Sequence, residues 1–162
     1  MDEEVIILGK KSWLAYVKSF VLSFVFVMLG SLIVGILDVF IDFPISYEVF
    51  NNIIYPIVLL VFSAYKLWDT SSYILYYDTE GIWYFSGVLP WTKGVRGVRW
   101  RDLDNATCRI GAISWFTNSY DVRINHRYTK ENEIYLSDMW KGNKIVEIIN
   151  EEHNRLIINA EI

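Results

Sequence analysis

The chain has 162 residues, a net charge of −4 and one cysteine, Cys108. A single cysteine excludes an internal disulfide and a cysteine-rich zinc site, and the acidic balance argues against a nucleic-acid-binding protein, which needs a strongly basic surface. The length allows a pair of membrane helices and one further domain of about 90 residues, a workable size for an independent core.

Residues 19–65 contain no lysine or arginine, and two apolar runs lie within this stretch. The first run, residues 19–37, nearly reaches the roughly 20 apolar residues that cross the hydrocarbon core of a bilayer. It is apolar all round, whereas a core helix of a soluble protein usually has a polar face. We therefore favour a membrane helix over a buried helix of a soluble protein.

The second run, residues 49–65, is shorter and carries Asn51, Asn52 and Pro56. It either spans the bilayer or forms a buried or re-entrant helix, and spanning is the favoured interpretation. The expected hairpin has spans at about 14–37 and 49–67, within an amino-terminal segment of residues 1–70.

Lysines flank the hairpin, whereas its connection carries only acidic side chains. Lys10, Lys11 and Lys18 precede the first run, and Lys66 follows the second. Basic residues near membrane-spanning segments stay on the cytoplasmic side. We therefore expect a multi-pass protein with both termini in the cytoplasm.

Residues 71–162 are predicted to form one α+β domain. Aromatic and β-branched residues favour strands, and the expected ones are 73–77, 82–85, 98–100, 106–110, 115–116, 120–124 and 133–136. The stretch between residues 87 and 97 is expected to be broken by its glycines and proline.

An amphipathic helix is expected to end the domain, with Asn143 as its N-cap. Ile145, Ile148, Ile149 and Leu156 fall on one face at helical spacing. Consecutive strands followed by one amphipathic helix indicate a small antiparallel sheet closed by that helix.

Four segments together give the chain a familiar layout: residues 5–13 leading into the hairpin, 73–82, 98–103 and the closing 140–156. In this layout the chain resembles the bacterial pleckstrin-homology-like (PH-like) membrane proteins. The resemblance implies a bent antiparallel sheet, or partly open barrel, of about seven strands capped by a carboxy-terminal helix. It also implies a location in the bacterial cytoplasmic (inner) membrane and a non-enzymatic role.

Residues 93–101 are the chemically most distinctive segment. Its basic side chains suit phosphate, because a guanidinium is planar and bidentate and an ammonium is a compact charge; they are Lys93, Arg96, Arg99 and Arg101. The glycines between them would let the backbone approach a headgroup. The segment repeats every three residues, which fits neither a strand nor a helix, so the sequence does not predict which bases converge. The alternative is a solvated strand and loop whose charges aid solubility.

Aromatic side chains of this domain either fill its core or mark a surface for a partner. Trp91, beside Pro90 in an expected loop, is the one most expected at the surface. We therefore add Trp91 to the four bases as the candidate lipid- or partner-binding residues.

No catalytic residue is assigned, because the sequence shows no nucleophile elbow, phosphate loop or dinucleotide fingerprint. His126 and His153 lie on separate expected elements without metal-spaced partners. We expect neither a metal, a cofactor nor enzymatic activity.

These observations favour a non-catalytic, membrane-anchored interaction or scaffold module within a larger bacterial membrane assembly. Its partners would be membrane lipids and either another protein or copies of itself. One alternative is a sensor of anionic lipid headgroups that uses residues 93–101. A second is a channel or transporter subunit, which the lack of ionisable residues in the spans disfavours.

Overall fold

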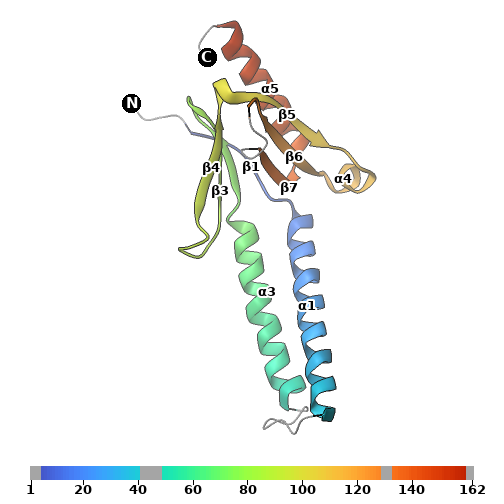
Figure 1. The fold of residues 1–162 in the computed structure, drawn as a ribbon. Coiled ribbons are helices and arrows are strands. Elements are labelled where there is room, and N and C mark those ends of the chain that lie inside the picture. Colours follow the sequence, from blue (N-terminus) through green and yellow to red (C-terminus); the bar gives the residue numbers. More distant parts are fainter. Residues whose placement is uncertain (1–4, 41–48, 129–132, 160–162) are drawn as a thin grey trace. The chain divides into compact units, whose positions relative to one another are not determined.

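The chain divides into two compact units, a helical one (Tyr16–Thr70) and one that carries the strands (Met1–Ala15 with Ser71–Ile162) (Figure 1). The computed structural model describes residues 5–40, 49–128 and 133–159.

Two helices, α1 (Trp13–Phe40) and α3 (Tyr55–Ser71), build the helical unit, and a π-helical turn, η1 (Phe50–Ile54), leads into α3. The stretches Trp13–Leu37, of 25 residues, and Asn52–Ser71, of 20 residues, are long and apolar enough to cross a membrane by length and composition. The structure thus has a helix at each of the two predicted spans, and the second lies a few residues later than expected. Their insertion in a bilayer stays a prediction.

Small polar side chains line the contact between α1 and α3. The hydroxyls of Ser19 and Thr70 lie 2.9 Å apart, and Ser23 is fully buried and donates to the Ser19 carbonyl at 2.8 Å. Farther along, the rings of Phe26 and Phe62 stack with centroids 5.4 Å apart. From the Ser19–Thr70 pair to the Phe26–Phe62 pair the residue number increases on α1 and decreases on α3, so the two helices run antiparallel. Small residues allow close helix packing without an apolar driving force.

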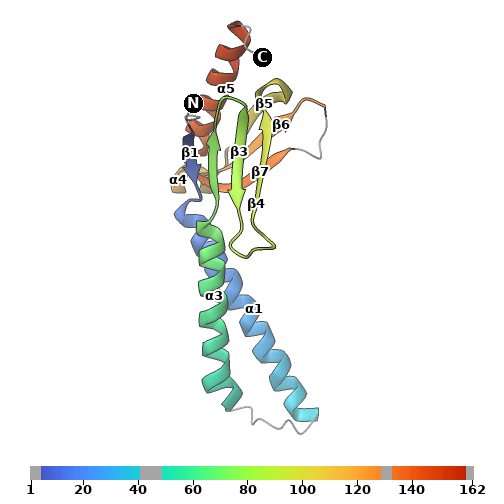
Figure 2. The ribbon, with the colours of Figure 1, turned by 90° about the vertical axis from the view of Figure 1, so that its left-hand side faces the viewer.

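The first sheet has four antiparallel strands in the order β1-β2-β3-β4 (Figure 2). The strands are β1 (Ile6–Lys10), β2 (Ile74–Tyr77), β3 (Gly81–Ser86) and β4 (Gly94–Arg99). Strands β2 and β3 confirm the strands predicted at 73–77 and 82–85.

The sequence patterns do not predict β1, and they misplace β4. Strand β1 comes from the segment that precedes the hairpin and pairs with β2, with Lys10 opposite Ile74. The prediction of a broken stretch up to residue 97 is wrong from Gly94 onward, because all six residues of β4 pair in register with β3. The predicted strand at 98–100 is the end of β4, followed by a 3₁₀ turn, η2 (Trp100–Asp102).

Gly97 belongs to β4 because the indole of Trp83 occupies the space where a side chain would be. A Cβ on Gly97 would lie 2.0 Å from the Trp83 ring and 2.5 Å from the Ile82 carbonyl oxygen. This glycine therefore packs against an aromatic ring, in place of the predicted approach of a lipid headgroup.

The second sheet has three antiparallel strands in the order β5-β6-β7. These are β5 (Leu103–Arg109), β6 (Ser119–His126) and β7 (Ile134–Trp140), and they confirm the strands predicted near 106–110, 120–124 and 133–136.

A short helix, α4 (Ala112–Thr117), joins β5 to β6, so the strand predicted at 115–116 is wrong. Aromatic side chains favour strands on average, but local hydrogen bonds decide here. The Thr117 hydroxyl donates to the Ile113 carbonyl at 2.7 Å, and Asn118 ends the helix in the left-handed region at φ 51°.

Helix α5 (Gly142–Ile158) packs on β5 and β6. Its predicted N-cap is wrong: Asn143 lies inside the helix, and the flanking residue, Lys141, makes no side-chain cap. Ile145, Ile149 and Leu156 are buried as predicted, but Ile148 is 42% exposed because it lies on the far flank of the buried stripe.

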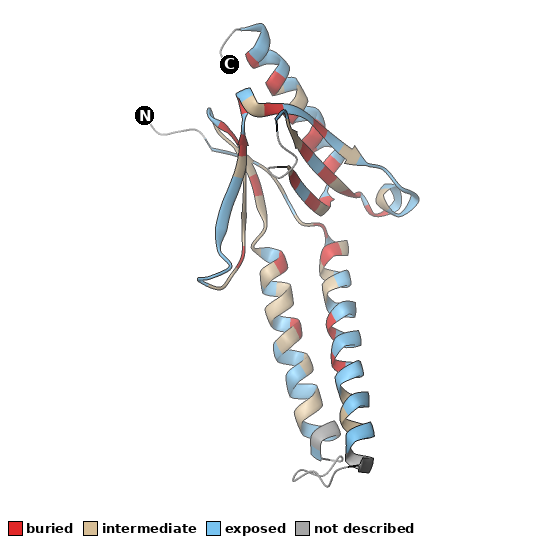
Figure 3. Cartoon of the chain, viewed as in Figure 1, coloured by how far each residue is buried: buried red, intermediate tan, exposed pale blue. Residues whose placement is uncertain are grey.

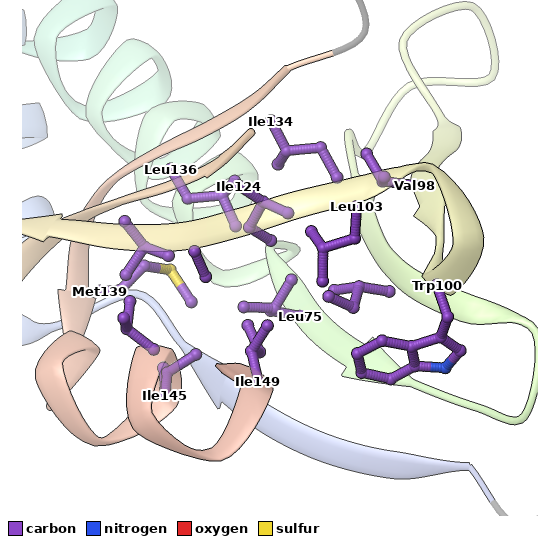
Figure 4. Packing of buried hydrophobic residues seen from close by; sticks show 14 of the residues in the cluster. Leu75, Val98, Trp100, Leu103, Ile124, Ile134, Leu136, Met139, Ile145 and Ile149 are labelled. Carbon is purple, nitrogen blue, oxygen red and sulfur yellow. The ribbon is translucent and has the colours of Figure 1, made fainter. Parts of the chain in front are cut away.

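Both sheets and α5 contribute to one hydrophobic core (Figure 4). Its fully buried members include Leu75, Val98, Trp100, Leu103 and Ile149. The Trp100 indole N–H donates to the Asp78 carbonyl at 2.9 Å, which satisfies its one polar atom. The predicted α+β class is thus confirmed with antiparallel sheets of four and three strands, while the PH-like identity stays a prediction.

Replacing Gly97 by alanine should destabilise the strand-bearing unit, because the Trp83 ring or the β3 backbone must shift. Overpacking of this kind costs about 1–3 kcal/mol. The matched control is Gly94→Ala in the same strand, where a Cβ would meet nothing within 4 Å. Thermal unfolding of the full chain in detergent, followed by near-ultraviolet circular dichroism, should show a lower midpoint for Gly97→Ala only. Equal midpoints for both variants would contradict this packing.

Candidate interaction surface

The four predicted bases do not form one site. Lys93 lies just before β4, Arg96 and Arg99 lie in β4, and Arg101 lies in η2. All four are exposed, but Lys93 and Arg99 are about 20 Å apart along an extended strand. Arg96 and Arg99 are three residues apart and thus on opposite faces, and Arg101 is 3.6 Å from the Asp102 carboxylate.

The β3–β4 turn, residues 87–93, presents Trp91 to the surface. The amides of Thr92 and Lys93 donate to the Leu89 carbonyl at 2.8 and 2.9 Å, which closes the turn. Trp91 is 78% exposed, as the sequence predicts.

The α4 loop, residues 110–118, is a second exposed apolar segment. The sequence left open whether its aromatic residues, Trp115 and Phe116, lie in the core or at the surface, and neither was among the candidate binding residues. Ile110, Ile113, Trp115 and Phe116 are 70%, 69%, 73% and 81% exposed. Figure 3 shows the loop around α4 coloured mostly as exposed. Burying each such side chain would contribute roughly 1.5–3 kcal/mol, so four of them together make this loop a candidate interaction surface. The available signal was a run without any charge between Arg109 and Asp121.

Hydrogen bonds hold both segments next to the ends of the strand-bearing unit where the chain continues into the helices. Ser12 caps α1 by accepting from the Leu14 amide at 3.1 Å, and its hydroxyl donates to Ser119, just after the α4 loop, at 2.7 Å. At the other junction, the Gly87 amide of the β3–β4 turn donates to the Ser72 hydroxyl at 3.0 Å. Ser72 directly follows α3, so the start of the β3–β4 turn and the end of the α4 loop each lie beside one helix junction.

The outer face of the four-stranded sheet is also apolar. Ile82 and Leu75 point into the core, so their neighbours Trp83 and Tyr76 point outward. Val95 on β4 and Ile7 on β1 share this face and are 54% and 61% exposed. An antiparallel sheet with one solvated face normally alternates apolar and polar residues, so this face is unusually apolar.

The outer face of the three-stranded sheet is polar and contains a hollow of about 290 Å³. The Tyr135 hydroxyl donates to one Asp121 carboxylate oxygen at 2.9 Å, and the Asp138 amide donates to the other at 3.1 Å. This hydrogen bond to Asp121, with burial, raises the pKa of Tyr135. The Tyr135 phenol is therefore held protonated, and both Asp121 carboxylate oxygens accept hydrogen bonds. These bonds join β6 to β7 and thus stabilise the sheet. The hollow is lined by Thr107, Cys108, Arg109, Asp121, Arg123 and Tyr135.

His153 is buried in α5 and stacks on Trp100 with ring centroids 6.4 Å apart. Its Nε2 is buried and has no hydrogen-bond partner among the described residues. Burial lowers the pKa of His153, Arg127 lowers it further by repulsion, and a hydrogen bond to the Trp100 backbone and the charge of Asp104 partly oppose this. The neutral ring is thus part of the core.

The lowered pKa of His153 should make stability depend on pH. Well above pH 6.5, the ordinary pKa of a histidine, the ring is neutral in both the folded and unfolded states. As the pH falls through 6.5 the unfolded state binds the proton first, so stability falls until the folded pKa is reached. His153→Leu should lose less stability than the parent chain over the same acid shift, measured as the thermal midpoint of the full chain in detergent. Parallel pH profiles for the two proteins would contradict this.

In the described part of the chain, no three histidine, cysteine or acidic side chains come together as a metal site. Comparison of the chain with protein-family models, curated proteins and solved structures finds no match.

Proposed function

We propose that this protein is a non-catalytic interaction module, anchored in a bacterial cytoplasmic membrane by α1 and α3, whose strand-bearing unit binds a protein partner or a second copy. The observation that supports this proposal most is the exposed apolar surface of α1. Phe20, Leu22, Leu29 and Ile33 are each half or more exposed on this helix. Lipid accommodates such a surface, and a helix satisfies its own backbone hydrogen bonds there.

The charges flanking the helices support an orientation with both termini in the cytoplasm. Lys18 lies near the start of α1 and Lys66 near the end of α3. Of the three acidic residues expected in the connection, Asp38 lies within α1 instead, and Asp42 and Glu48 lie outside the described residues.

Exposed apolar surface supports interaction as the working activity. The outer face of the four-stranded sheet offers Ile7, Tyr76, Trp83 and Val95 to an apolar partner surface. Exposed apolar patches on folded proteins are commonly sites of association. The alternative of a headgroup sensor gains no support from the geometry, because its four bases are spread along β4 and η2.

Cysteine labelling in intact cells tests the membrane topology. In a Cys108→Ser background, Ser46→Cys in the connection should react with a membrane-impermeant maleimide added outside. Thr107→Cys, exposed on β5, should react only after the cells are broken. Labelling of Thr107→Cys in intact cells, or no membrane association at all, would refute the proposed anchoring.

Association should depend on the apolar face of the four-stranded sheet. Val95→Glu places a charge on this face and should reduce the recovered complex, whereas Thr107→Glu, on the polar face of the other sheet, should leave it unchanged. The measurement is the protein mass in mild detergent, by light scattering, against the 19.1 kDa of one chain. A single-chain mass for the unaltered protein, with no partner bound, would contradict the proposal.

A further inference from the structure

Two apolar segments, the α4 loop and the β3–β4 turn, each have one end next to a point where the chain passes between the strands and the helices. Ser119, at the end of the α4 loop, bonds to Ser12, the cap of α1, and Gly87 of the turn bonds to Ser72, just after α3. We propose that both segments insert into the headgroup layer of the membrane that α1 and α3 cross. The inference depends on the proposed membrane anchoring.

The reach of the chain permits this contact. Phe116 is three residues from Ser119, which places the two Cα atoms within about 11 Å of each other. From Ser12 to Phe20, the first large apolar residue after Lys18, α1 rises about 12 Å. The headgroup layer on each side of the hydrocarbon core is about 5–8 Å thick. A side chain that starts beside Ser12 can therefore reach this layer.

The chemistry of the two segments suits a lipid interface. Each presents an exposed tryptophan, Trp91 or Trp115, a side chain that prefers the boundary between lipid and water. No acidic residue occurs in residues 81–101 or 105–120, which contain the two segments. Lys93 ends the turn, and Lys141, whose amide donates to the Asn118 carbonyl at 2.9 Å, lies beside the α4 loop. These two lysines place positive charge where anionic headgroups would lie.

Lipid is favoured over a protein as the occupant because both segments are tied to the junctions with helices that have apolar outer surfaces. A protein partner would have to bind beside these junctions, where the proposed anchoring puts lipid. Polar groups within each segment bond to one another, because the Leu89 carbonyl accepts from the Thr92 and Lys93 amides and the Ile113 carbonyl accepts from the Thr117 hydroxyl.

Fluorophore labelling of the full chain in vesicles tests this contact. Single cysteines in a Cys108→Ser background, Trp91→Cys and Phe116→Cys, would carry an environment-sensitive fluorophore. The vesicles contain anionic phospholipid and a lipid-attached quencher, placed at a shallow position of the acyl chain for the labels at 91, 116 and 158 and at a deep position for Met28→Cys. Met28→Cys, exposed on α1, reports insertion of the helix, and Ile158→Cys, 82% exposed at the end of α5, is the matched exposed control.

Quenching at positions 91 and 116 should be at least twofold stronger than at position 158 when each vesicle holds at most one chain. Quenching at Met28→Cys with none above the control at 91 and 116 would overturn the lipid contact and leave the anchoring intact. No quenching at Met28→Cys would overturn the anchoring and the contact together. If the fluorophores at positions 91 and 116 leave the aqueous environment only when a vesicle holds several chains, these segments contact a second copy, and the proposal is overturned.

Discussion

The pairing of β1 with β2 is the constraint on which the rest of the structure depends. Lys10 lies opposite Ile74, so the chain leaves the sheet for α1 and returns from α3 on neighbouring strands. In the helical unit, the start of α1 and the end of α3 are likewise close together, because the Ser19 and Thr70 hydroxyls are 2.9 Å apart. A long helical insertion thus fits between two adjacent antiparallel strands without breaking the sheet.

This arrangement also concentrates the exposed apolar surface. The strand that precedes α1 continues into Lys11 and Ser12, which bond to β7 and β6. The end of the α4 loop and the start of the β3–β4 turn consequently lie beside the two helix junctions, although 16 residues separate Lys93 from Ile110 in the sequence. The strands that these loops join contribute buried residues such as Ile82, Val98, Leu103 and Val122 to the hydrophobic core, so both loops are attached to a packed unit.

Strand and helix patterns predicted the elements whose signals are local. Strands β2, β3 and β6 have enough aromatic and branched residues to be recognised without knowledge of their partners. Strand β4 does not, because two of its six residues are glycines. The reason for a glycine at position 97 is the Trp83 ring of β3, which fills the space that a side chain would need. The α4 loop was misread for a related reason: Trp115 and Phe116 have high strand propensity, but a helical turn closed by Thr117 and Asn118 leaves them outside the core.

By itself, the sequence determined that two long apolar helices precede an α+β unit with a closing helix, because length, apolar content and periodicity are properties of short stretches. Tertiary structure decided which exposed residues share a surface. The bases at Lys93, Arg99 and Arg101 are close in sequence but spread along an extended strand and its following turn, while Ser12 and Ser119 are distant in sequence and joined by a hydrogen bond. Strand pairing over long separations sets these neighbours, and one-dimensional patterns carry no information on register between distant segments.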